Sequence, residues 1–201
     1  MSIRILFAPL ALTALMATVA CTSKKETDSP SFTRIDSLTD IYLVLQDSML
    51  DTWNMMIKDD NQKIKSMKSL VHELQIGGQY TAGDLKAYEQ RVDQLIRIRY
   101  TPKTLSNADV VEEYDFASSS LVSELIALAE SYTAFSYNTT MQKLVEEIRA
   151  ADLRVETYRS DYDAVALRYN QFIDENWNLL KEISDSTSLD KKPLFQVTAD
   201  Q

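Results

Sequence analysis

The stretch MQKLVEEIRAADLRVETYRSDYDAVALRYNQFI, residues 141–173, decides the fold. Its apolar side chains recur at steps of three and four residues, at Met141, Leu144, Ile148, Ala151, Val155, Tyr158, Tyr162, Val165, Tyr169 and Phe172. Such a period places them on one face of a helix. Neither proline nor glycine interrupts the run. The sequence therefore predicts one long amphipathic helix that begins at Asn138 or Thr139.

The same period recurs upstream. It runs from Ile35 to Leu74, where Gly77-Gly78 follows as a stop, and a bend near the polar step 59–61 stays open. Two shorter stripes cover 85–96, after possible caps at Thr81 and Asp84, and 111–132, after Asn107. Only three glycines and four prolines occur in 201 residues, so turns are few. We predict an all-α fold, an elongated antiparallel four-helix bundle over 35–183 with long first and last helices, and a loose tail at 184–201.

The N-terminus has the pattern of a secreted, lipid-anchored protein. One charge at Arg4 precedes the uncharged residues 5–20, which are too short for a comfortable membrane span and contain Pro9. Thr18-Val19-Ala20 before Cys21 resembles the lipobox of bacterial lipoproteins, although Thr18 replaces the usual leucine. This resemblance implies a cleaved signal peptide at 1–20, acyl chains (palmitate) on Cys21 and a tether at 21–34. The alternative is an ordinary signal with an incidental cysteine.

The charge and the scarce reactive residues exclude several functions. The chain has a formal net charge of −9, and loss of Arg4 with the signal would leave 20 basic and 30 acidic residues, or −10. Such a protein repels nucleic acid. One histidine, His72, cannot supply the paired Glu-x-x-His motifs of di-iron bundles, and Ile76 breaks a zinc-protease pattern. We therefore expect no enzyme activity, metal or cofactor.

The remaining polar and aromatic patterns have structural explanations. Neighbouring acids such as Asp59-Asp60 point in different directions on a helix, so we interpret them as a solvated face. Tyrosines on the last helix are expected to pack their rings and to leave their hydroxyls near water or a polar partner. The candidate residues for structure or for a partner face are Arg154, Arg159, Tyr162, Tyr169 and Asn170. Arg159 and Asn170 are expected at the edge of the bundle, with Arg159 in an exposed pair and Asn170 tying a neighbouring helix or the tail.

Residues 144–173 resemble the C-terminal helix of the LemA family, with Asp152, Arg154, Arg159, Tyr162 and Tyr169-Asn170 at matching spacings. The segments ALAESYTAF, residues 127–135, and KKPLFQV, residues 191–197, resemble two further family segments, with Thr133 in place of a proline. The first long helix departs more, since KSMKSLVHEL, residues 65–74, lacks the usual proline and asparagine. The resemblance implies a helical bundle outside the membrane and no established enzymatic activity.

Two functions stay open at this point. The first is a non-catalytic scaffold or adaptor, held at the bacterial cell envelope by the lipid on Cys21, which binds another envelope protein. The second is a lipoprotein that binds a small ligand or cation in a pocket between helices. A hydrolase would need a converged acid–base pair, which the sequence does not display.

Overall fold

The computed structural model describes residues 33–183 and 189–196. Its helices are α1 (Arg34–Ile76), α2 (Ala82–Ile98), α3 (Ala108–Glu130), a 3₁₀ turn η1 (Phe135–Tyr137) and α4 (Thr139–Ile183), and no strand occurs among these residues. The signal peptide at 1–20, Cys21 and the tether up to residue 32 are predictions that lie outside the described residues. The all-α prediction is confirmed.

Local capping chemistry sets where the helices begin. Thr33 caps α1 and Thr81 caps α2, each in a capping box with the aspartate three residues later. Asn107 accepts from the Asp109 N–H at the start of α3, and Asn138 accepts from the Met141 N–H at the start of α4. These contacts confirm the starts of the last three helices at the residues that the sequence indicated.

Contacts between side chains of the two helices show that α1 and α4 run antiparallel. Along α1, Tyr42 lies beside Tyr169, Trp53 beside Tyr162, and Ser66 bonds Glu147, so the partner number falls as the α1 number rises. Between α1 and α3 the numbers rise together, because Asp60 contacts Tyr114 and Gly77 contacts Tyr132. Between α1 and the α2 region the numbers run in opposite directions, because Met56 contacts Tyr100 and Lys68 contacts Asp93. The four helices therefore alternate in direction, as a bundle with short connections requires.

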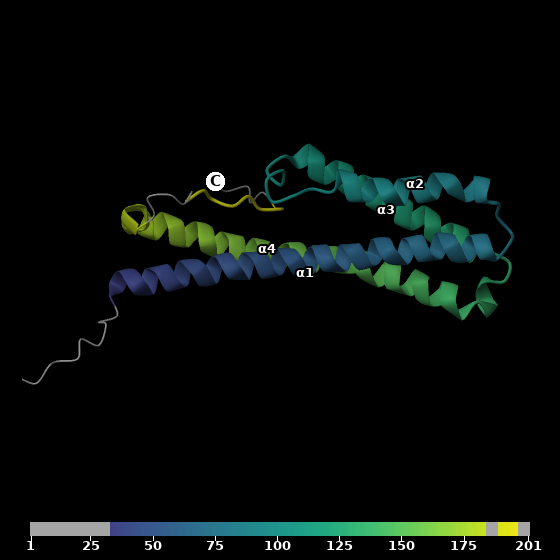
Figure 1. Cartoon of the computed structure of the whole chain (residues 1–201), viewed down its shortest axis with the longest axis horizontal. Helices are drawn as coiled ribbons and strands as arrows, with labels where there is room; N and C mark the ends of the chain where they lie inside the picture. The colour runs from purple at the N-terminus through teal and green to yellow at the C-terminus, as the bar shows by residue number, and fades with distance from the viewer. Residues whose placement is uncertain (1–32, 184–188, 197–201) are drawn as a thin grey trace, which may run out of the picture. The chain divides into compact units, whose positions relative to one another are not determined.

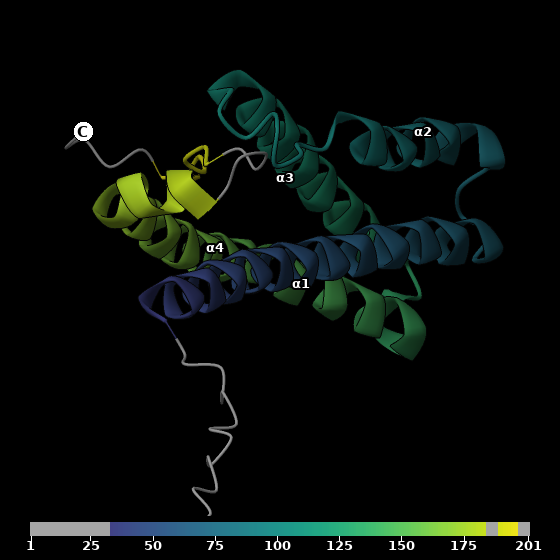
Figure 2. The same cartoon turned by 60° about the vertical axis from the view of Figure 1, so that its left-hand side comes forward.

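Four helices lie together over only part of the bundle's length. In Figures 1 and 2, α2 and α3 lie beside the C-terminal half of α1 and the N-terminal half of α4. Hydrogen bonds and ion pairs that join α1 to α3 begin at Asp60. The N-terminal half of α1 instead packs on the C-terminal half of α4.

The first long helix has no break at residues 59–61, and its 43 residues are continuous. No proline or glycine lies in this region to break it. It ends at Gly77-Gly78. Gly78 has a φ of 75°, which a residue with a side chain rarely adopts. A Cβ on Gly77 would lie 2.6 Å from the hydroxyl oxygen of Tyr132, so a larger residue there would displace the Tyr132 side chain.

The prediction of a loose tail is wrong for residues 189–196, which follow α4 closely (Figure 1). The Asn170 side chain both donates to the Lys192 carbonyl, at 2.9 Å, and accepts from the Lys192 N–H, at 2.7 Å. The Asp163 carboxylate accepts from the N–H groups of Phe195 and Gln196. These contacts satisfy four backbone groups of the segment without helix or sheet, and side chains in such contacts need no regular sequence period. Residues 184–188 and 197–201 lie outside the described part.

Candidate functional site

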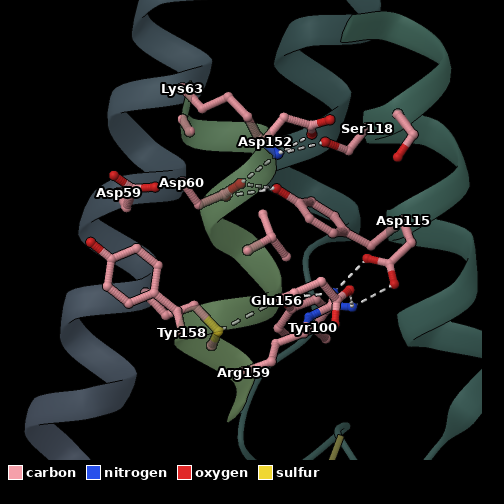
Figure 3. A pocket seen from close by; sticks show the side chains of 15 residues that line it. Asp59, Asp60, Lys63, Tyr100, Asp115, Ser118, Asp152, Glu156, Tyr158 and Arg159 are labelled. Atoms are coloured by element: carbon pink, nitrogen blue, oxygen red, sulfur yellow. Dashed lines mark hydrogen bonds and ion pairs between the residues drawn. The ribbon is translucent and has the colours of Figure 1, made fainter. Parts of the chain in front are cut away.

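A cavity of about 160 Å³ lies between α1, α3 and α4, and its wall is crowded with ionisable side chains (Figure 3). Its lining residues are Met56, Asp59, Asp60, Lys63, Tyr100, Tyr114, Asp115, Ser118, Ser119, Ala151, Asp152, Val155, Glu156, Tyr158 and Arg159. Charged groups enter such a place only when they are paired, because removal from water costs each ion several kcal/mol. The pairing therefore decides what the cavity can do.

Asp60 is the centre of the ionic network. Its side chain is 11% exposed, and the Tyr114 hydroxyl lies 2.6 Å from both carboxylate oxygens. The Arg99 guanidinium lies 2.7 Å from one oxygen and the Lys63 ammonium 3.6 Å from the other. One hydroxyl donor and two cations from three segments thus converge on one carboxylate. The interpretation of Asp59-Asp60 as a solvated face is wrong, because these positions face the packed helices.

Lys63 carries the most deeply buried charge of the cavity. Its side chain is 2% exposed, and the ammonium donates to the Ser118 hydroxyl at 2.9 Å and contacts the Asp152 carboxylate at 3.4 Å. Buried lysines are rare unless they are paired, and here carboxylates on α1 and α4 balance the charge. The network therefore links all three helices around the cavity.

Arg159 is buried, which contradicts its expected place in an exposed pair. The residue is 8% exposed, and its guanidinium donates to both Asp115 oxygens, at 2.8 and 2.5 Å, and to the Tyr100 hydroxyl at 3.2 Å. Its guanidinium carbon lies 4.8 Å from the centre of the Phe195 ring. Burial alone would lower the pKa of Arg159, but the hydrogen bonds to Asp115 and Tyr100 outweigh it and raise that pKa. Residues 189–196, called the returning segment from here on, and α3 bury this side chain. Neither contact can be read from a helical period.

Tyr162 lies next to the cavity, in a cluster of aromatic rings. Its ring centre is 5.5 Å from that of Trp53 and 5.7 Å from that of Phe195, in edge-to-face arrangements. Tyr100 packs on both Trp53 and Phe195. Edge-to-face pairs are favourable for aromatic rings beyond the area that they bury. This cluster explains why the structure places Tyr162 in the core, as its position on the stripe predicted.

Tyr169 and Asn170 lie further along α4 and belong to another contact. Tyr169 is fully buried, its ring packs on Tyr42 at 5.9 Å, and the Lys192 ammonium lies 5.4 Å from its ring centre. Asn170 is buried under the returning segment. Of the two alternatives for Asn170, the structure shows the tie to the tail.

Arg154 is half exposed and pairs with Asp59 at 2.6 Å, beside the cavity. The candidate residues of α4 therefore do not form one continuous face. Arg154 and Arg159 hold acids of α1 and α3, Tyr162 packs in the aromatic cluster, and Tyr169 and Asn170 contact Tyr42 and the tail. Most of these residues support the bundle and are not free to meet a partner.

Sequence reasoning missed most residues of the network, among them Asp60, Lys63, Tyr100, Tyr114, Asp115 and Ser118. A signal for the first two was present. Met56, Asp60, Lys63, Met67, Leu70 and Leu74 follow one another at steps of four and three. Two opposite charges at stripe positions indicate a buried ion pair when the stripe itself faces the core. The other four could be found only from the register between helices.

Alkaline pH is expected to weaken the fold through buried tyrosines. Burial raises the pKa of Tyr162 to about 12, and nearby Asp163 acts in the same direction. Below about pH 10 the folded and unfolded states both keep the proton, so the full stability is present there. Above it the unfolded state ionises first, and Tyr162 alone removes roughly 1.4 kcal/mol per pH unit until its folded pKa is reached. Urea unfolding between about pH 8 and pH 11 measures this slope.

The matched control is Tyr162→Phe, which keeps the ring and removes the proton. Above about pH 10, the free energy of unfolding of the variant should fall less steeply with pH than that of wild type. The difference should be roughly 1.4 kcal/mol per pH unit, the contribution of one proton. Burial also raises the pKa values of Tyr114 and Tyr169, so the variant should retain part of the alkaline loss. Equal slopes for the variant and the wild type would contradict the assignment to Tyr162.

A second hollow is larger and more open. A groove of about 660 Å³ lies between the start of α3 and the returning segment, with Leu105, Val111, Leu194 and Phe195 among its apolar residues. Small-molecule sites usually occupy about 300–1,000 Å³, a range that includes this groove and excludes the charged cavity.

Two further searches concern ions and membranes. Within the part of the chain that the structure describes, no cluster of three or more His, Cys, Asp or Glu side chains could hold a metal ion. His72 is exposed on α1. Across 33–183 and 189–196, no helix has both the length and the hydropathy to cross a bilayer.

Comparison with known proteins gives a family match. Residues 80–201 match the model of a family described as the LemA family. The match includes the segments 127–135, 144–173 and 191–197, and it extends upstream to the start of the second helical stripe. Neither curated proteins nor solved structures gave a match.

Proposed function

The chain belongs to the LemA family, and we propose that it is a membrane-anchored bacterial envelope lipoprotein whose bundle serves as a non-catalytic scaffold or adaptor for another envelope protein. The proposal combines two observations. Lipobox-like residues precede Cys21, and the charged side chains inside the bundle are paired with one another. Enzyme activity has no part in it.

The observation that carries the proposal is the contrast between the interior and the surface. In the cavity, Asp60, Lys63, Asp115, Asp152 and Arg159 all contact an opposite charge. A general acid or base needs a pKa and a position that serve a substrate, whereas these groups serve one another. The N-terminal half of α1, by contrast, exposes large apolar side chains at Ile41, Leu43, Val44, Leu50 and Met55, around more than one side of the helix. Exposed apolar patches commonly mark protein or membrane contacts.

Replacing Cys21 by alanine tests the anchor. We expect wild type to fractionate with membranes and the variant to be released, because stable anchoring takes at least two acyl chains, each contributing about 0.8 kcal/mol per buried CH₂. The same fractions serve for affinity capture of wild type with quantitative mass spectrometry. A stoichiometric protein partner is expected. A variant that stays in the membrane fraction contradicts the lipid anchor, and a wild type without a partner contradicts the adaptor.

Binding of a small polar ligand is a second candidate, favoured by the groove of about 660 Å³ beside Arg159 and Lys192. Its volume suits a ligand of ordinary size. A ligand that raises the melting temperature in wild type, but not when Leu194 is replaced by aspartate, would favour this function over the adaptor.

A further inference from the structure

The N-terminal half of α1 has an outer face that no described part of the chain covers. Ile41, Val44 and Met55 are 45%, 62% and 56% exposed. Val44 and Met55 lie on the side of the helix away from Tyr42, Met49 and Met56, which are buried, and Ile41 lies on the flank between the two sides. A helix packed on one side only normally has polar residues on the other. The three side chains therefore form an interrupted apolar row that the fold itself does not require, with Ile41 and Val44 at one end and Met55 roughly 16 Å further along the helix.

Acidic residues continue this row along the helix. Asp40, Val44, Asp47, Asp51 and Met55 follow at steps of four, three, four and four, and such spacing keeps them on one side of the helix. The three aspartates are exposed and form no ion pair within the described residues. Residues 35–57 also contain Asp36, and they contain no lysine or arginine. We call Asp40, Ile41, Val44, Asp47, Asp51 and Met55 the outer α1 face.

We propose that the outer α1 face docks a basic amphipathic helix of a partner protein. The helix would lay an apolar stripe on Ile41, Val44 and Met55 and bring lysine or arginine side chains to Asp40, Asp47 and Asp51. This inference rests on the proposed adaptor function and names the chemistry of its partner. From Asp40 to Met55 the face is roughly 22 Å long at 1.5 Å per residue, which is about four turns of a partner helix.

Charge selects this occupant over two others. A second copy of the chain would bring its own aspartate row against Asp40, Asp47 and Asp51, and like charges in contact oppose association. An anionic bilayer surface would repel the same row. A basic helix has the opposite charge together with the apolar stripe, which is the combination that helix-in-groove recognition uses.

The test uses the full chain and two synthetic helical peptides of equal length. Both have leucine at the a and d positions of each heptad, and one has lysine and the other glutamate at e and g. We expect the lysine peptide to bind and the glutamate peptide to fail, as measured by fluorescence anisotropy. The triple variant Asp40→Lys, Asp47→Lys, Asp51→Lys should lose affinity by about tenfold or more, since exposed pairs are each worth up to about 1 kcal/mol.

A matched variant separates the face from overall charge. Glu113→Lys, Asp161→Lys, Glu175→Lys changes the net charge by the same amount at exposed residues elsewhere, and it should bind the lysine peptide within about twofold of wild type. Val44→Asp should also lose binding, because it removes apolar contact. Equal loss of peptide binding in both triple variants would overturn the proposal. Dimerisation of wild type, or its binding to anionic vesicles, would also overturn it if Val44→Asp abolished that association.

Affinity capture from membranes tests the docking face and the adaptor function separately. If wild type retains a stoichiometric partner and the Asp40, Asp47, Asp51 variant retains it equally, the docking face is wrong and the adaptor function stands. If wild type captures none, the adaptor function itself fails. Thermal melts of each variant are expected to match wild type, since all the altered side chains are exposed.

Discussion

Replacing Asp60 by alanine is expected to lower the free energy of unfolding by about 3–5 kcal/mol, as for removal of one partner from a buried ionic cluster. The substitution leaves the Lys63 ammonium at 2% exposure with only Asp152 as its acidic partner. It also removes the acceptor of the Tyr114 hydroxyl and the ionic partner of Arg99. Urea unfolding followed by far-ultraviolet circular dichroism measures the loss.

The neighbouring residue supplies the control. Asp59→Ala removes an equal charge one position earlier, but its partner Arg154 is 45% exposed and regains water when the pair is lost. We expect a cost of about 1 kcal/mol or less. If both alanine variants unfolded at the same urea concentration, the burial of the network would not be what stabilises the fold.

Tyr162→Ala is the other change with a large expected effect, about 3–5 kcal/mol, the usual range for deleting a buried aromatic side chain. The ring fills the space between Trp53 of α1 and Phe195 of the returning segment. Its loss leaves a cavity where residues 189–196 pack against α1 and α4. Thermal melts and urea titrations should both show the decrease.

Tyr162→Phe separates packing from the hydroxyl. It keeps the ring contacts, so near neutral pH it should cost less than about 1.5 kcal/mol. The alternative for Tyr162 is a partner site, in which alanine would leave the melt unmoved and abolish partner capture. An unchanged melting temperature for Tyr162→Ala would therefore refute the structural role of this residue.

Much of the secondary structure follows from residues that are close in the chain. The helical stripe of 141–173 depends on side chains three and four positions apart, and the caps at Thr81, Asn107 and Asn138 act within two or three residues. Few glycines and prolines then leave long helices with short connections, which pack antiparallel. For these reasons the all-α bundle could be predicted.

The candidate site could not be predicted to the same extent. Asp60 and Tyr114 are 54 residues apart, Lys63 and Asp152 are 89, and Arg159 and Asp115 are 44. Which of these groups meet depends on the axial positions of α1, α3 and α4 relative to one another. That register follows from the shapes of all the core side chains together, and a periodic pattern does not contain it.

The sequence by itself therefore determined the helices, their limits and their alternating directions, because those depend on local spacing and capping. Only the tertiary structure decided that Arg159 is buried, that Asp60 and Lys63 are paired inside, and that residues 189–196 pack on α4. These features depend on side chains brought together from distant segments. A charged residue on the edge of a stripe is exposed or buried according to what covers it, and here α3 and the returning segment cover it.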